Sequence, residues 1–242
     1  MEEEPDGTIQ IRIAVAADVK YVYPILEEME RSARARGTGI AKRTPQSLCK
    51  KIYEGKAVIA IAVKGDIGSR GVDGVVNGNE PGREEWAGFS YIETWTDGEF
   101  ISNSGLIVNP VYRKAGVATA IKKEIFTLSR RRYPKARIFS ITTGAAVMKL
   151  NHKLGFEPVT YSEITRDERF WDQCRHCVNY SILEANQRKM CLCTAMLFTP
   201  GQVDGSSVCK TVDGSSVSKT DRENTGTGSI RSTLRLGELM AG

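Results

Sequence analysis

The sequence predicts a mixed α/β domain followed by a tail that has no core of its own. Strand-like apolar runs are interspersed with segments whose apolar residues recur at helical spacing. After Pro200 the composition changes, because residues 201–242 contain no Phe, Tyr or Trp and are rich in Gly, Ser and Thr. A segment so poor in large apolar side chains cannot offset the entropy cost of ordering. We therefore expect a folded domain over 8–200 and a low-complexity, disordered tail over 201–242.

The tail also contains a tandem duplication of nine residues. Val203–Thr211 is followed directly by Val212–Thr220, with one change, from Cys209 to Ser218. A small β-repeat is the alternative to disorder, but two copies bury too little core to support each other.

The first half of the domain is predicted to contain one strand, two helices and three more strands. Asp18 is a typical cap for a first helix whose apolar residues extend to Ala33, and Thr44-Pro45 opens a second helix that ends near Gly55. Turn residues 96–98 join the last two strands into a hairpin, and the Gly-rich stretch 65–86 is expected to be a flexible insertion. The expected strands are Ile9–Val15, Ala57–Val63, Ala87–Trp95 and Phe100–Val108.

The second half is predicted to begin with a long helix, Ala115–Arg132, in which Ile121, Ile125 and Leu128 share one apolar face. The segments that follow are expected to be a strand, a helix and two strands: Arg137–Thr142, Ala145–Leu154, Phe156–Ile164 and Cys191–Thr199.

Composition excludes several classes of protein. The net charge of +5, without a dense basic patch, does not indicate nucleic-acid binding. No apolar run reaches the roughly 18–20 residues of a membrane span, and the acidic start is unlike a secretory leader. Six cysteines in 242 residues are too few for a disulfide scaffold. We therefore expect a cytoplasmic protein with reduced thiols that contacts neither membrane nor nucleic acid; a homodimer is compatible with this.

The most informative stretch runs from Val108 to Ala118. An apolar strand passes through Pro110 into a loop with Arg, Lys and Gly that opens a long helix. A helix start offers unpaired N–H groups and partial positive charge, and small residues let an anion come close to the backbone. On the loop alone, an ordinary strand-to-helix turn is an equal alternative to a pyrophosphate site.

The pattern Val-x-Pro-x-Tyr-Arg-x-x-Gly-x-Ala, from Val108 to Ala118, resembles the acyl-CoA-binding signature of the GNAT acetyltransferase superfamily. Leu150–Glu157 is similar to the second signature of that superfamily, and the resemblance covers about residues 8–165. It implies the GNAT fold, a mixed, mostly antiparallel sheet flanked by helices, and acetyl-CoA or succinyl-CoA as co-substrate. The residues that it implies for binding the co-substrate are Ile107, Val108, Arg113, Lys114, Ala115, Gly116, Val117, Ala118 and Asn151.

The resemblance further implies transfer of the acyl group to an amine. Many members carry a Tyr that protonates the departing thiolate, where this chain has Asn151, which can donate a hydrogen bond to sulfur but supplies no proton. The candidate base is Glu93, since aromatic neighbours in its strand would desolvate the carboxylate and raise its pKa. A solvated strand glutamate is the alternative.

The acceptor is expected to be acidic. The loop 34–44 is basic, and arginine grips carboxylates well, so Lys42 and Arg43 are candidate substrate-binding residues. Asn103 and Ser104, polar residues on the hairpin's second strand, are further candidates. Three runs, Ala35–Arg43, Asn103–Val108 and Thr142–Gly144 with Val147–Lys149, resemble Bacteroidetes-type stand-alone GNAT proteins associated with arginine biosynthesis. This resemblance implies L-glutamate as acceptor. The alternatives are a non-catalytic acyl-CoA-binding module and an acetyltransferase for another amine or a protein lysine.

Four of the six cysteines lie within twenty residues, at 174, 177, 191 and 193. C-x-x-C followed by C-x-C could hold a structural zinc ion, with His176 as a substitute ligand. The alternative is a set of buried thiols that pack as small apolar groups. We therefore assign no metal-binding residue from the sequence.

Overall fold

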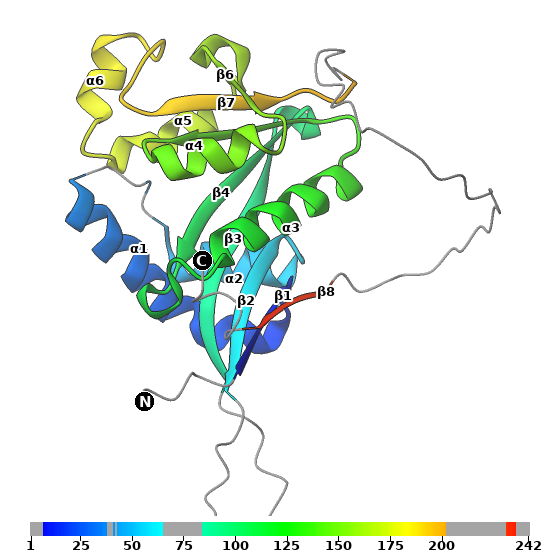
Figure 1. Cartoon of the computed structure of the whole chain (residues 1–242). Helices are drawn as coiled ribbons and strands as arrows, with labels where there is room; N and C mark the ends of the chain where they lie inside the picture. Colours follow the sequence, from blue (N-terminus) through cyan, green and yellow to red (C-terminus); the bar gives the residue numbers. More distant parts are fainter. Residues whose placement is uncertain (1–6, 38–40, 42, 65–83, 202–230, 236–242) are drawn as a thin grey trace, which may run out of the picture.

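The computed structural model describes residues 7–37, 41, 43–64, 84–201 and 231–235. Within these ranges eight strands form one sheet, in the order β6-β7-β5-β4-β3-β2-β1-β8 (Figure 1). The strands are β1 (Gly7–Ile13), β2 (Ala57–Lys64), β3 (Glu84–Trp95), β4 (Phe100–Val108), β5 (Arg137–Thr142), β6 (Glu157–Val159), β7 (Thr194–Phe198) and β8 (Arg231–Arg235). The α-helices are α1 (Val22–Arg36), α2 (Pro45–Tyr53), α3 (Val117–Arg132), α4 (Ala145–His152), α5 (Glu168–Asp172) and α6 (Tyr180–Ala185).

The sheet is antiparallel except at its centre, where β4 and β5 run parallel. That pairing is short: only Phe100–Ser102 of β4 pair with residues 137–139 of β5. The rest of β4, up to Val108, is paired only on its β3 side in the described chain. The two central strands therefore diverge toward the end of β4, which is where α3 begins.

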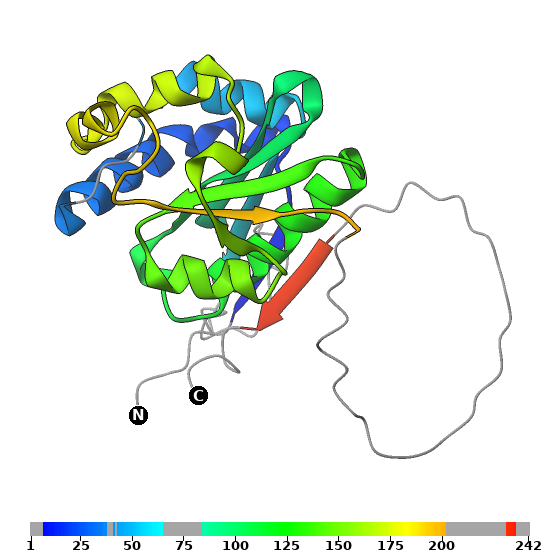
Figure 2. The same cartoon turned by 90° about the horizontal axis from the view of Figure 1, so that it is seen from above.

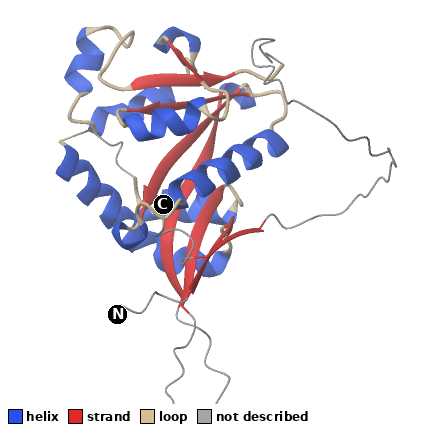
Figure 3. Cartoon of the chain, in the orientation of Figure 1, coloured by secondary structure: helices blue, strands red, loops and turns tan. Residues whose placement is uncertain are grey.

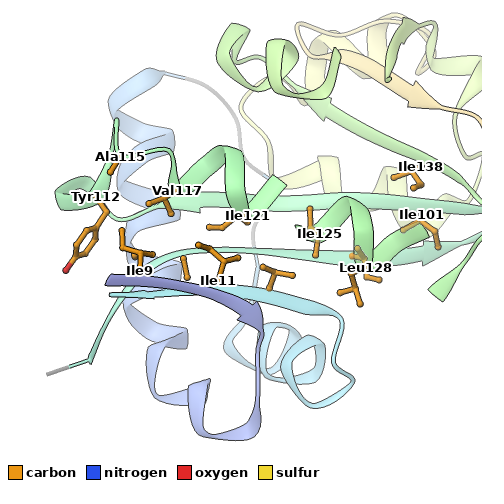
Figure 4. Packing of buried hydrophobic residues seen from close by; sticks show 14 of the residues in the cluster. Ile9, Ile11, Ile101, Tyr112, Ala115, Val117, Ile121, Ile125, Leu128 and Ile138 are labelled. Carbon is orange, nitrogen blue, oxygen red and sulfur yellow. The ribbon is translucent and has the colours of Figure 1, made fainter. Parts of the chain in front are cut away.

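Helices cover both faces of the sheet (Figures 2 and 3). One face carries α3, whose buried side chains Ile121, Ile125 and Leu128 pack on Ile9 and Ile11 of β1 and on residues of the central strands (Figure 4). The other face carries α1 and α2, through Ile25 and Leu48, together with the helices between β6 and β7, which pack through Trp171. This confirms the predicted fold class and the predicted order of elements up to β6.

The first helix starts later than predicted, at Val22. A 3-10 helix over Ala16–Tyr21 precedes it. Pro24 lies in the first turn of α1. It has no N–H, but a residue in the first turn needs none, because N–H groups there have no acceptor within the helix. Asp18 still caps a helix start, but that of the 3-10 helix: its carboxylate accepts a hydrogen bond from Val15 N at 2.7 Å and pairs with Arg12.

The strand predicted over Phe156–Ile164 is wrong beyond Val159. The chain turns at Thr160, whose N–H donates to the Glu163 carboxylate at 2.8 Å, and a 3-10 helix covers Tyr161–Glu163. Two short helices follow, α5 and α6, in a stretch where no element is predicted from the sequence. The last predicted strand is shorter than expected, because β7 begins at Thr194.

The expected insertion and tail fall mostly outside the described residues, at 65–83, 202–230 and 236–242. The insertion ends earlier than predicted, because Glu84–Trp86 already belong to β3. Within the tail, β8 pairs antiparallel with β1, and Arg231 to Arg235 lie opposite Arg12 to Thr8. No helix among the described residues is long and apolar enough to cross a membrane.

Candidate functional site

The loop between β4 and α3 is held in place by side chains from β3 and from the loop itself. Asn109, which is buried, donates its amide to Trp86 O at 3.0 Å and accepts from Val111 N at 3.2 Å. The Tyr112 hydroxyl donates to the Glu85 carboxylate at 2.8 Å. Burial, together with that carboxylate, raises the pKa of Tyr112 well above its ordinary value. The backbone leading into α3 therefore has a fixed path.

The start of α3 has no side-chain cap. Lys114 and Gly116 both have φ +69, and Gly116 is the N-cap residue of α3. Gly116 has no side chain to cap the helix, and no side chain among the described residues accepts a hydrogen bond from the first N–H groups of α3. Left-handed residues at a helix start turn successive N–H groups toward one point, an arrangement that suits an anion. The positive φ of Lys114 costs of the order of 1 kcal/mol, and such strain is typical of functional loops.

The other residues predicted at this loop fall into three groups by their exposure to solvent. Ile107, Ala115 and Val117 are buried in the core, so they position the backbone. Val108 and Ala118 are half-buried, while Lys114 and Gly116 are exposed at the helix start. Lys114 and Gly116 are therefore the most exposed of these residues at the helix start.

Arg113 does not extend from the helix start as a free cation. Its guanidinium donates to the Glu28 carboxylate of α1 at 2.5 Å and to Ser32 Oγ at 3.0 Å. Glu28 is 3% exposed and also pairs with Arg31. Burial alone would raise the pKa of Glu28, but hydrogen bonds from Arg31 and Ser32 outweigh it and lower that pKa. Arg113 thus connects the loop to α1, a position that the sequence could not reveal because its partner lies 85 residues away.

A β-bulge lies beside this loop, where β3 and β4 change register between Phe89 and Tyr91. Gly105 on β4 has φ +66, and a Cβ there would lie 2.6 Å from the Tyr91 ring. Only glycine fits such a site without displacing the ring. The bulge therefore brings Tyr91 close to β4 where this strand parts from β5.

Tyr91, Glu93 and Trp95 project from β3 onto the face that α1 and α2 cover. Arg43 donates from Nε to the Tyr91 hydroxyl at 2.8 Å, and its Nη1 donates to Ala41 O. Within the described part of the chain Nη2 of Arg43 has no hydrogen-bond partner. Lys42, the other predicted cation, lies outside the described residues.

Glu93 lies in an environment different from the one predicted. Its carboxylate accepts a hydrogen bond from Lys51 of α2 at 2.5 Å, with side-chain exposures of 23% for Glu93 and 9% for Lys51. The expected desolvated carboxylate among aromatic rings is instead one half of a partly buried salt bridge. Glu93 nevertheless lies two residues after Tyr91 on β3, so the two side chains share the face on which Arg43 contacts Tyr91.

The polar residues of β4 divide between the two faces. Ser104 donates to Ser102 Oγ at 3.1 Å, and Ser102 accepts from the Trp95 indole at 2.9 Å, so both serines lie on the face of Glu93. Asn103 points the other way and donates to Ser129 of α3 at 2.8 Å, in the core. Asn103 is therefore not beside the predicted acceptor residues, because neighbours on a strand face opposite sides.

Asn151 is fully buried near the end of α4, on the face of α3. Its amide nitrogen lies 3.5 Å from the Met196 sulfur, and its Oδ1 has no hydrogen-bond partner in the described structure. An unpaired buried amide oxygen is costly, typically about 1–3 kcal/mol, so this position is unusual for a purely structural residue.

The cysteines lie in the segment between β6 and β7, against the core around Trp171. Burial, with the neighbouring cysteines contributing, raises the pKa of the Cys174 thiol to about 11 and that of the Cys193 thiol to about 12. Among the described residues no three His, Cys, Asp or Glu side chains meet in a group that could hold a metal. The zinc site that the sequence left open therefore finds no set of ligands among the described residues, and Cys174 and Cys191 are partly buried against that core.

A cavity of about 1460 Å³ opens at the other end of the sheet, lined by Phe100, Arg137, His152 and Asp167 among others. It adjoins the starts of β4 and β5, whereas α3 begins beyond the end of β4. This cavity is therefore separate from the site at the α3 start.

Comparison with protein-family models and with curated proteins found no match. Among solved structures, the chain is similar to N-acetylglutamate synthase from Neisseria gonorrhoeae complexed with coenzyme A and N-acetyl-glutamate (TM-score 0.49, 15% identity, 79% of this chain). It spans 35% of the length of that protein. It is also similar to a putative acetyltransferase from Acinetobacter baylyi ADP1 (TM-score 0.48, 13% identity, 80% of this chain and 92% of the other). A third similar structure is a putative acetyltransferase from Salmonella typhimurium with its cofactor acetyl-CoA (TM-score 0.45, 17% identity, 83% and 99%). With TM-scores below 0.5, we draw no function from these likenesses.

Proposed function

We propose that this chain is an acyl-CoA-dependent N-acyltransferase that moves an acetyl or succinyl group to a small acidic amine, with L-glutamate as the candidate acceptor. The observation that carries the proposal is the start of α3: uncapped N–H groups follow two left-handed residues, Lys114 and Gly116, beside the point where β4 parts from β5. This arrangement suits the pyrophosphate of coenzyme A. The signature from Val108 to Ala118 supports the same ligand.

The thioester would follow β4, because its unpaired edge offers backbone N–H and C=O groups. In the reaction the amine attacks the thioester carbonyl, the C–S bond breaks, and a thiolate leaves. A backbone N–H near Leu106–Val108 would donate to the oxygen on which negative charge develops. Glu93, held by Lys51, is the candidate group that removes a proton from the amine, directly or through water.

Arg43 supports an acidic acceptor. Its Nε and Nη1 are engaged by Tyr91 and Ala41, which fixes the guanidinium and leaves Nη2 to bind a carboxylate. Asn103 plays no part in this proposal because it faces α3.

Thiol release from acetyl-CoA and succinyl-CoA, measured with a panel of amino acids, tests the proposal. We expect release with glutamate or aspartate and much less with lysine. The Arg43→Gln variant should raise KM for the acidic acceptor about tenfold or more, since a charge-assisted hydrogen bond contributes about 1.5–3 kcal/mol. Arg34→Gln is the matched control, because Arg34 is exposed and pairs with Glu30 on α1.

The alternative is a module that binds acyl-CoA without turnover, which is favoured by the absence of a proton donor at Asn151. Stabilisation by acyl-CoA without thiol release for any amine would support that alternative and contradict the enzyme.

A further inference from the structure

The two ends of the sheet differ in how they are protected against pairing with another strand. At one end β6 is three residues long and contains Pro158, and both features hinder further pairing. Toward the other end lies β1, seven residues long, which pairs with β2 along its whole length. The outer side of β1 is covered by β8, a strand of five residues from the C-terminal tail (Figures 1 and 2).

The outer side of β1 is a strongly pairing edge in its own right. Residues 7–13 contain three isoleucines and one threonine, alternate between apolar and polar from Thr8 onward, and include no proline. Arg12 is the one charged residue of this strand, and its guanidinium donates to both carboxylate oxygens of Asp18, at 2.6 and 2.9 Å. That charge is therefore paired and does not repel a second strand. An edge of this kind is a template for pairing with another chain.

The sequence of β8 has the opposite character. Arg231 and Arg235 stand at its two ends, and only five residues take part in the pairing. Short strands and flanking positive charges are features by which proteins keep a sheet edge from pairing further. Thr233, at the centre of β8, is exposed and lies opposite Gln10 of β1. With β8 in place, the sheet ends in a short strand flanked by arginines instead of in β1.

The tail of the same chain can reach this edge. Five strands separate β7 from β8 in the sheet, a distance of roughly 30 Å at about 4.8 Å per strand. Residues 202–230 form the connection, and at about 3.3 Å per residue they can span about three times that distance. Pairing of β8 with β1 of its own chain therefore meets no limit of length.

We propose that β8 is an edge-covering strand, and that the surface it covers, the outer side of β1, otherwise pairs with β1 of a second copy of this chain. Antiparallel pairing centred on Gln10 sets Ile9 of one copy opposite Ile11 of the other, and Thr8 opposite Arg12. Ile9 and Ile11 are fully buried on the face of α3, so this register continues the apolar face from one copy to the next. The inference does not depend on the proposed acyltransferase activity.

The first test uses the full chain with two prolines in β8, Ser232→Pro/Thr233→Pro. Neighbouring residues of a strand point their N–H groups to opposite sides, so one of the two prolines removes an N–H that faces β1. Ser206→Pro/Ser207→Pro, in the tail but outside β8, is the matched control. We expect the β8 variant to have twice the wild-type mass in sedimentation at high protein concentration, and the control to keep the wild-type mass.

Hydrogen exchange tests directly whether β8 covers β1. Alternate amides of β1 face β8, and in the β8 variant we expect them to exchange about tenfold faster or more than in the wild-type protein. Rapid exchange of these amides in the wild-type protein, a measurement that needs no variant, would overturn the proposal. Rapid exchange in the β8 variant with the wild-type mass at every concentration would also overturn it, because the edge would then be open without associating.

A further variant identifies the surface that associates. Adding Gln10→Lys to the β8 variant sets two lysines opposite each other at the centre of the β1 pairing, where like charges are destabilising. We expect the wild-type mass to return, whereas Gln10→Lys alone leaves the mass of the wild-type protein unchanged. A mass that stays doubled would show association through another surface and would overturn the proposal.

Discussion

Gly88 allows α3 to approach the sheet, and its replacement by alanine is the sharpest test of how the loop is positioned. Gly88 lies on β3 opposite Val108, the last residue of β4. A Cβ at this position would lie 2.5 Å from Ile121 Cδ1, 3.0 Å from Ile107 O and 3.2 Å from Val117 Cγ1. Ile121 and Val117 are both buried and belong to the first turns of α3. The Ile121 methyl group can rotate away, but the Ile107 carbonyl belongs to the strand and cannot.

We expect Gly88→Ala to destabilise the domain by about 1–3 kcal/mol, the usual cost of overpacking a core. For a domain of this size that corresponds to a decrease in Tm of about 3–9 °C. Because the strain falls on the start of α3, the affinity for acyl-CoA should fall as well. Thermal unfolding and equilibrium binding of acetyl-CoA measure the two effects.

The double variant Gly88→Ala/Ile121→Val gives a control for the mechanism. Valine lacks the Cδ1 atom that makes the shortest contact, so the double variant should be more stable than the sum of the two single effects predicts. Unchanged Tm and affinity in Gly88→Ala, or strictly additive effects in the double variant, would refute this account of how α3 packs.

Two further predictions concern the carboxylates of the site. Glu28→Gln should lower the free energy of unfolding at pH 7 by about 1–2 kcal/mol, a moderate cost because both paired arginines keep contact with water. Since the folded-state pKa of Glu28 is lowered, its contribution is fully present above the ordinary carboxyl pKa and is lost as the pH falls from there through the folded-state pKa. Urea unfolding should therefore show a smaller difference between variant and wild type at pH 3 than at pH 7, and an equal difference at both pH values would contradict the ionic role. Glu93→Gln should reduce kcat about 100-fold or more while acyl-CoA affinity stays constant, and wild-type turnover in that variant would assign the base elsewhere.

The sequence predicted the elements that local pattern specifies. Strands β1 to β5 and helices α2 to α4 lie within a few residues of their predicted ranges, because alternation, helical spacing and Pro or Gly positions act over a few residues. The helices of the segment 160–193 were not predicted, because they are too short to show a helical repeat of apolar residues. Their buried residues Trp171 and Leu183 are held in place by packing on the sheet. Pairing of β8 with β1 joins ends of the chain that no local pattern relates.

The candidate site shows the same division. Alternation places Ser102 and Ser104 on one face of β4 and Asn103 on the other, but the sequence could not tell which face meets α1 and which meets α3. The helical spacing of α3 places Lys122 next to the face that packs on the core. Lysines at such positions usually extend their amine to solvent, so the spacing alone does not predict that Lys122 is buried. The Lys51 partner of Glu93 likewise depends on how α2 docks against β3.

By itself the sequence determined the local conformation of the loop that leads into α3, because the backbone preferences of Pro110 and Gly116 and the apolar periodicity of the helix act at short range. Only the tertiary structure decided where the charges go: Arg113 to Glu28 of α1, Arg43 to Tyr91 of β3, and Lys122 into the core beside the Phe156 ring. The physical reason is that the electrostatics of a side chain depend on its burial and its neighbours, and these are set by contacts between elements far apart in the chain.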